Sequence, residues 1–118
     1  MKFIRSFDYA FQGIRYCFRT QFNFRVQATA ACIVIAAGFL LHISPTEWLF
    51  IILCSTLVLL LEMINTAIEQ LCDLVTMEVH PLIKTIKDVS AAAVLLAAAV
   101  SIATGLIIFL PKISGLLH

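Results

Sequence analysis

Charged residues are scarce in this sequence. Asp, Glu, Lys and Arg make up only 13% of the 118 residues, whereas 62% of the residues are hydrophobic. A soluble domain carries about 25% charged residues, and so short a chain could not hide this much apolar surface from water. The composition therefore excludes a water-soluble globular domain and predicts an integral membrane protein. The net charge of +1 gives no reason to expect a nucleic-acid partner.

Several common signatures are also missing. The four cysteines form no C-x-x-C pair, so we interpret them as buried thiols that behave as small hydrophobic residues. The four glycines are isolated from one another, so the sequence has neither a Walker loop nor a kinase-type glycine loop. Charged residues interrupt the first twenty positions, and we therefore expect no secretory signal there.

The apolar pattern predicts an all-α protein with a single membrane domain over residues 1–118. Residues 3–20 carry apolar side chains at helical spacing opposite a basic face, which is typical of an amphipathic helix lying in the membrane interface. Three longer apolar segments each meet the requirement of about 20 residues for a transmembrane helix. They cover residues of about 26–43, 48–72 and 89–110. We expect Pro45 to stop the first of these helices and the third to end before Pro111.

The distribution of basic residues predicts the orientation. Five Lys or Arg residues lie in the N-terminal region and two lie in the connection 73–88, whereas the turn 42–47 has none. Cytoplasmic segments are enriched in Lys and Arg. We therefore expect a multi-pass protein with its N-terminus and the connection 73–88 in the cytoplasm.

Four polar residues share one face of the second span. At 100° per residue, Glu62, Asn65, Glu69 and Asp73 fall within a narrow stripe on an otherwise apolar helix. Glu62 lies roughly 21 Å past Trp48, which places it inside the hydrocarbon in its cytoplasmic third, with Asp73 at the cytoplasmic boundary. Ionisable residues inside a membrane are expensive and usually functional. A polar contact between helices is the structural alternative.

The stripe suits phosphoryl transfer. Carboxylates near a cytoplasmic boundary can hold Mg²⁺ together with phosphate oxygens, and Glu62 is placed to act as a base for a hydroxyl that arrives from the lipid. Lys87, beside Asp88, could hold phosphates, although such a pair is also typical of a helix cap with a snorkelling lysine. Glu78 and His80 could contact a nucleotide or could simply be solvated. A small oligomeric transporter and a non-catalytic assembly subunit are the rival interpretations.

The sequence resembles the prokaryotic diacylglycerol kinase family, which includes the undecaprenol kinases. The resemblance is carried by Glu62-x-x-Asn65-Thr66-Ala67-Ile68-Glu69-x-x-x-Asp73 and by Lys87-Asp88-x-x-Ala91-Ala92-Ala93-Val94, with support from Ala10-x-x-Gly13 and Asn23-Phe24-Arg25. It implies a homotrimer in the bacterial inner membrane, with active sites between protomers, that uses ATP and Mg²⁺ to phosphorylate a membrane lipid.

The same resemblance implies a role for each matched residue. Glu62 would be the catalytic base and Glu69 a metal ligand, while Arg25 and Asn65 would organise the lipid end. The nucleotide contacts would be Tyr9, Glu69, Asp73, Glu78, Lys87 and Asp88.

One position departs from the family pattern. Where the family has a second metal-binding glutamate, three residues before the Phe24-Arg25 pair, this chain has Gln21. A glutamine carbonyl can bind Mg²⁺ but brings no negative charge, so we expect weaker metal binding or compensation by an acid such as Asp8. The residues of these motifs resemble the undecaprenol kinase branch of the family more than the diacylglycerol kinase branch. The resemblance therefore favours undecaprenol as the acceptor, with diacylglycerol as the alternative.

Overall fold

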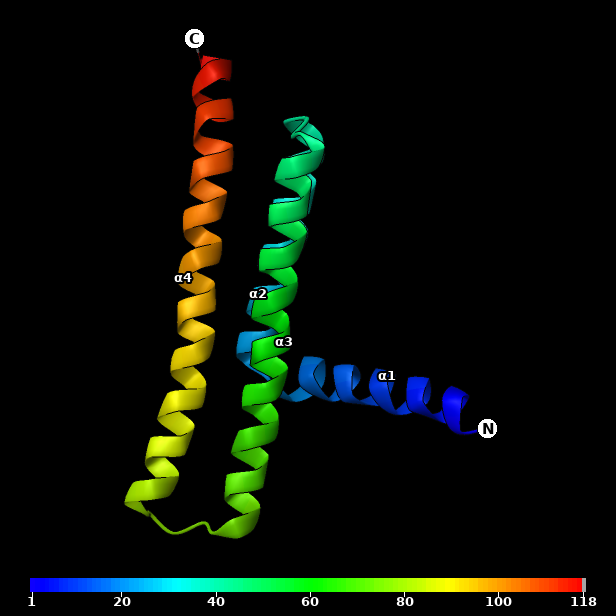
Figure 1. The fold of residues 1–118 in the computed structure, drawn as a ribbon, viewed down its shortest axis with the longest axis vertical. Helices are drawn as coiled ribbons and strands as arrows, with labels where there is room; N and C mark the ends of the chain where they lie inside the picture. The colour runs from blue at the N-terminus through cyan, green and yellow to red at the C-terminus, as the bar shows by residue number, and fades with distance from the viewer. Residues whose placement is uncertain (118) are drawn as a thin grey trace.

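The computed structural model describes residues 1–117 and consists of four helices. They are α1 (Lys2–Thr20), α2 (Phe22–Leu40), α3 (Pro45–Val75) and α4 (Pro81–Leu117). Helices α2, α3 and α4 run along one another, and α1 projects sideways from them (Figure 1). These three helices are long and apolar enough to cross a membrane. The prediction of an all-helical membrane protein with three candidate spans is therefore confirmed.

The turn between α2 and α3 has a different cause from the expected one. Helix α2 ends at Leu40, and His42 then adopts a left-handed conformation with φ 52°. Ser44 and Glu47 form a capping box, in which each backbone N–H donates to the other residue's side chain. Pro45 occupies the first turn of α3, where its missing N–H costs no hydrogen bond. The prediction that Pro45 stops the preceding helix was wrong, because this proline begins α3.

Helices α3 and α4 are longer than the sequence indicated. The polar connection 73–88 is non-helical only over residues 76–80, and α4 already begins at Pro81. At its other end, α4 continues through Pro111 to Leu117, so the predicted end before Pro111 was wrong. A proline removes one helical hydrogen bond, but tertiary contacts can hold the helix together around it. Lys112 provides such a contact, because its Nζ lies 3.2 Å from Glu47 Oε1 of α3.

Because α3 and α4 are longer than α2, part of each does not have α2 beside it. At ~1.5 Å per residue, α2 is about 28 Å long, close to the ~30 Å of a hydrocarbon core, whereas α3 has 31 residues and is about 46 Å long. The additional length of α3 lies at its C-terminal end, next to the α3–α4 loop. This end of the bundle and the α2–α3 turn lie on opposite sides of α1 (Figure 1). The last turns of α3 and the first turns of α4 therefore extend beyond the start of α2.

The helices bury few side chains against one another. Ile43, Ile51 and Ile108 form a buried apolar cluster, and most other large apolar side chains are exposed. Exposed apolar surface on this scale is appropriate for contact with lipid or with another copy of the chain. The cysteines are all free; Cys17 and Cys72 are buried as expected, whereas Cys32 is exposed.

Candidate active site

Glu62 and Asn65 line a cavity of about 270 Å³ where α2, α3 and α4 come together. Glu62 is only 6% exposed. The α2 wall is formed by Asn23 and Gln27, and the α4 wall is apolar and includes Ala91 and Ala98. The small alanine side chains leave room in front of the carboxylate. Asn23 and Gln27 were not predicted as site residues; their spacing of four positions at the start of an apolar run was the signal available.

The hydrogen bonds around Glu62 and Asn65 leave one oxygen free. Asn65 Nδ2 donates to Glu69 Oε1 at 3.0 Å, and Thr66 Oγ1 donates to the backbone carbonyl of Glu62 at 2.9 Å. Asn65 Oδ1 is buried and has no hydrogen-bond partner among the described residues. Buried acceptors are nearly always satisfied. This oxygen is therefore available to a donor group or a cation that enters the cavity.

The last turn of α1 packs directly against this part of α3. Cys17 is 4% exposed and makes a side-chain hydrogen bond with Thr66, and its thiol is near enough to Glu62 to be affected by the charge of that carboxylate. Burial raises the pKa of the Cys17 thiol above its ordinary value, and the hydrogen bond with Thr66 offsets part of that rise. The thiol is thus neutral at physiological pH, as befits a group beside a carboxylate. Thr66 was quoted within a motif at the sequence level, but its contact with α1 was not foreseen.

Arg25 holds the end of α1 rather than lining the cavity. Its Nη1 donates to the carbonyl oxygens of Phe18 at 2.8 Å and Arg19 at 3.3 Å. These are among the carbonyls that the end of α1 leaves without helical partners. Arg25 therefore fixes how α1 leaves the bundle, which in turn fixes where Cys17 lies against Thr66.

A second cavity of about 280 Å³ lies at the α3–α4 loop. It is lined by four of the predicted nucleotide contacts, namely Asp73, Glu78, Lys87 and Asp88, together with His80 and Lys84. Lys87 Nζ lies 2.7 Å from Asp73 Oδ1, and Lys84 Nζ lies 2.6 Å from Asp88 Oδ2. His80 Nδ1 accepts from the backbone N–H of Leu82, so this side chain caps the start of α4. The structure brings these residues into one polar site.

The two cavities lie along the same side of α3. Asp73 lies eleven positions after Glu62, which corresponds to roughly 16 Å along the helix. Glu69 lies between them and is close enough to Glu62 for the two carboxylates to repel each other. The predicted stripe therefore joins a deep cavity that contains the candidate base to an exposed cavity that contains two lysines.

Tyr9 and Gln21 are not brought to either cavity. Tyr9 is 65% exposed on α1, and Gln21 Nε2 donates to Thr20 Oγ1 at the junction of α1 and α2. Asp8 bonds Gln12 and lies about 18 Å along α1 from the helix end next to Gln21. Compensation for Gln21 by Asp8 of the same chain is therefore ruled out. Within residues 1–117, no three His, Cys, Asp or Glu side chains are grouped as a metal site.

Comparison with known proteins identifies the family. The model of the prokaryotic diacylglycerol kinase family matches residues 8–109. The chain is 46% identical to the undecaprenol kinase of Bacillus subtilis (strain 168) over 112 residues, which cover 95% of this chain and 91% of that protein. It is 42% identical to a diacylglycerol kinase of Synechocystis over 113 residues, which cover 95% of this chain and 65% of that protein. The diacylglycerol kinase of Escherichia coli (strain K12) is 28% identical over 103 residues, which cover 87% of this chain and 84% of that protein. With a match over most of its length, the chain belongs to the prokaryotic diacylglycerol kinase family.

Proposed function

We propose that this lipid kinase transfers the γ-phosphate of ATP to the hydroxyl group of undecaprenol, with diacylglycerol as the alternative acceptor. The relative with 46% identity is an undecaprenol kinase, and those with 42% and 28% identity are diacylglycerol kinases. The observation that carries the proposal is the arrangement of the two cavities. A buried carboxylate and a polar site that contains two lysines lie along one side of α3, as transfer from a cytoplasmic nucleotide to a membrane alcohol requires.

Glu62 is the proposed general base. The acceptor hydroxyl enters the deep cavity and donates to the Glu62 carboxylate, which takes its proton as the oxygen attacks the γ-phosphorus. The bond from that phosphorus to the β–γ bridging oxygen breaks, and ADP leaves. Asn65 lines the same cavity, and its side chain would orient the acceptor head beside Glu62. Arg25 supports the lipid end indirectly, because it fixes the end of α1 beside Glu62.

The loop cavity is the proposed nucleotide site. Lys87 would exchange its contact with Asp73 for the phosphates of ATP. The carboxylates of Asp73, Glu78 and Asp88 would then accept hydrogen bonds from the hydroxyl and amino groups of the nucleoside. At ~1.5 Å per residue, the two cavities are roughly 16 Å apart along α3. ATP would span this distance by lying along α3 with its phosphates toward Glu69.

The residues between the cavities fit Mg²⁺. This ion prefers oxygen ligands and needs only one or two carboxylates beside water and phosphate. Glu69 and the free Asn65 Oδ1 supply oxygen atoms of that kind, and Gln21 of a neighbouring copy would complete the set. Bound Mg²⁺ would neutralise charge on the β- and γ-phosphates.

We further propose a homotrimer in the bacterial inner membrane, with the N-terminus in the cytoplasm and α1 in the interface. Both cavities are open on one side in the single chain. A neighbouring copy would close them and bring its Tyr9 and Gln21 to the nucleotide. The five basic residues of the N-terminal region favour the cytoplasmic side for α1.

Transfer of label from [γ-³²P]ATP to lipid in mixed micelles with Mg²⁺ tests this function. Undecaprenol and diacylglycerol are offered separately, with the Glu62→Gln variant as the control. Label in undecaprenol that the variant does not produce is the expected result. Preference for diacylglycerol would overturn the choice of acceptor, and no label in either lipid from folded protein would overturn the kinase assignment and reopen the transporter interpretation.

A further inference from the structure

Helix α1 is joined to α2 by a single non-helical residue, Gln21, which has φ −112° and ψ 107°. The helix projects sideways from the bundle beside the middle of α3 (Figure 1). Within the single chain, every residue of α1 from Lys2 to Thr20 is exposed except Cys17, which is 4% exposed. The position of α1 therefore depends on the contacts that its last turn makes.

The contacts of this last turn reach two different helices. The ring of Phe18 packs edge-on against the ring of Phe24 with centroids 4.8 Å apart, and Arg25 Nη1 donates to the Phe18 carbonyl. Both of these contacts join α1 to α2. Cys17 instead reaches α3, where its thiol forms a hydrogen bond with the side chain of Thr66. Thr66 is also 4% exposed, so both partners of this contact between α1 and α3 are buried.

Thr66 connects this contact to Glu62. Residues four positions apart are neighbours on one face of a helix, so Thr66 lies one turn from Glu62 on the same face. Thr66 Oγ1 donates to the backbone carbonyl of Glu62 at 2.9 Å. Because a hydroxyl group has one hydrogen to donate and can also accept, the Cys17 thiol is the donor in its bond with Thr66. The three groups therefore form a hydrogen-bonded chain from α1 to the turn of α3 that carries Glu62.

We propose that Thr66 and Cys17 are positioning residues, which hold the Glu62 carboxylate in its cavity by fixing α1 against the turn of α3 that carries it. This inference rests on the proposed kinase function. Neither residue lines the cavity in front of Glu62, whose walls include Asn23 and Ala91, so both act through Glu62 rather than on the acceptor. A base must lie within hydrogen-bond reach of the proton that it removes, and a misplacement of about 1 Å can cost about 10² in rate.

Variants that remove either partner test the inference by steady-state phosphate transfer, with ATP and the acceptor lipid varied in turn. Thr66→Val replaces the hydroxyl by a methyl group of similar size, and Cys17→Ala removes the thiol. We expect each to lower kcat about tenfold, with a change in the KM for ATP of about twofold at most. The double variant should lose no more than either single variant, because both changes break the same contact. Thr66→Ser and Cys17→Ser keep the hydrogen-bonding groups, so their kcat should lie within about threefold of the wild type.

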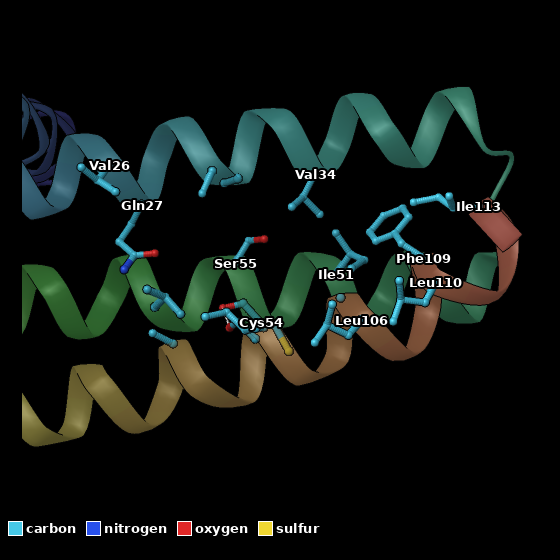
Figure 2. Close-up of a pocket in the computed structure, with 17 residues that line it drawn as sticks. Val26, Gln27, Val34, Ile51, Cys54, Ser55, Leu106, Phe109, Leu110 and Ile113 are labelled. Atoms are coloured by element: carbon cyan, nitrogen blue, oxygen red, sulfur yellow. Dashed lines mark hydrogen bonds between the residues drawn. The ribbon is translucent and has the colours of Figure 1, made fainter.

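The chain offers a matched control in a second cysteine–threonine contact between helices. Cys54 Sγ of α3 lies 3.7 Å from Thr104 Oγ1 of α4. Figure 2 shows Cys54 on the side of α3 that faces α4. Cys54 lies eight positions before Glu62, which is about 12 Å along α3. Cys54→Ala and Thr104→Val therefore remove a contact of the same kind away from the base, and we expect both to keep the wild-type kcat.

Three results would overturn the inference. An unchanged kcat for Thr66→Val would show that Glu62 is positioned without this contact, and losses that multiply in the double variant would show that the two residues act separately. Equal losses for the control pair would show that any weakened contact between helices slows the enzyme. All three leave the kinase function standing. A wild type that phosphorylates neither undecaprenol nor diacylglycerol would instead remove the kinase function, and this inference with it.

Discussion

Lys87 Nζ of α4 lies 2.7 Å from Asp73 Oδ1 of α3, and this ion pair ties the two helices together beside the loop that connects them. Both side chains are partly exposed, at 37% and 42%. An exposed pair of this kind contributes little to stability. Its place in a cavity lined by Asp88 and Glu78 suggests a ligand site, in which the pair is exchanged for contacts with a nucleotide.

Lys87→Met should weaken ATP binding. Loss of a charge-assisted contact with phosphate should raise the KM for ATP about tenfold, with a smaller change in the KM for lipid. Steady-state kinetics with each substrate varied in turn measure this. The chain offers a matched control in Lys112, another α4 lysine paired with an α3 acid, Glu47, at the opposite end of the helices. An equal rise in KM for Lys112→Met would contradict the assignment.

Glu62→Gln should abolish turnover while leaving nucleotide binding intact. A positioned general base contributes about 10² to 10⁴ in rate, so kcat should fall by that range, and the Kd for a non-hydrolysable ATP analogue should change less than twofold. Isothermal titration and label transfer separate the two effects. Glu47→Gln, also an α3 glutamate, is the control and should keep its rate. A variant of Glu62 with more than a tenth of wild-type kcat would exclude this residue as the base.

The helical stripe was predictable because it depends only on local geometry. Residues three, seven and eleven positions after Glu62 share its face in any straight α-helix, whatever packs against it. The structure keeps this arrangement and adds the bond from Asn65 to Glu69. The number of spans was predictable for a similar reason, because the length of an apolar segment is compared directly with the thickness of a bilayer.

The other walls of the site depend on contacts between helices, which no local pattern specifies. In the sequence, Gln27 is an isolated polar residue near the start of an apolar segment. Only the packing of α2 against α3 brings it to the cavity that contains Glu62. The continuation of α4 through Pro111 likewise depends on neighbouring contacts, which a proline rule does not include. Tyr9 and Gln21 lie outside both cavities of the single chain, so their predicted roles depend on contacts with another copy.

Gln21→Glu should strengthen the binding of Mg²⁺. A carboxylate is a better ligand for this ion than an amide carbonyl, because it brings negative charge. The Mg²⁺ concentration needed for half-maximal activity should therefore fall about threefold or more in this variant. Titration of Mg²⁺ at saturating ATP measures the change. Gln12→Glu, on the exposed part of α1, is the control; an unchanged Mg²⁺ requirement for Gln21→Glu would remove position 21 from the metal site.

Gly38→Ala should destabilise the turn between α2 and α3. A Cβ on Gly38 would lie 2.7 Å from Trp48 Cη2 and 3.1 Å from Ile43 Cδ1, closer than packed carbon atoms tolerate. The Trp48 ring also packs against the ring of Phe39, with centroids 4.8 Å apart, so moving the indole away would disturb that contact. Overpacking of this kind costs about 1–3 kcal/mol. Thermal unfolding in detergent should show a lower midpoint for Gly38→Ala.

Gly105→Ala is the natural comparison, since its new methyl group would meet nothing within 4 Å. Replacing a helical glycine by alanine stabilises a helix by about 1 kcal/mol, so the Gly105 variant should unfold at the wild-type midpoint or above. If both variants unfolded above the wild type, Gly38 would not be needed for the approach of Trp48 to α2.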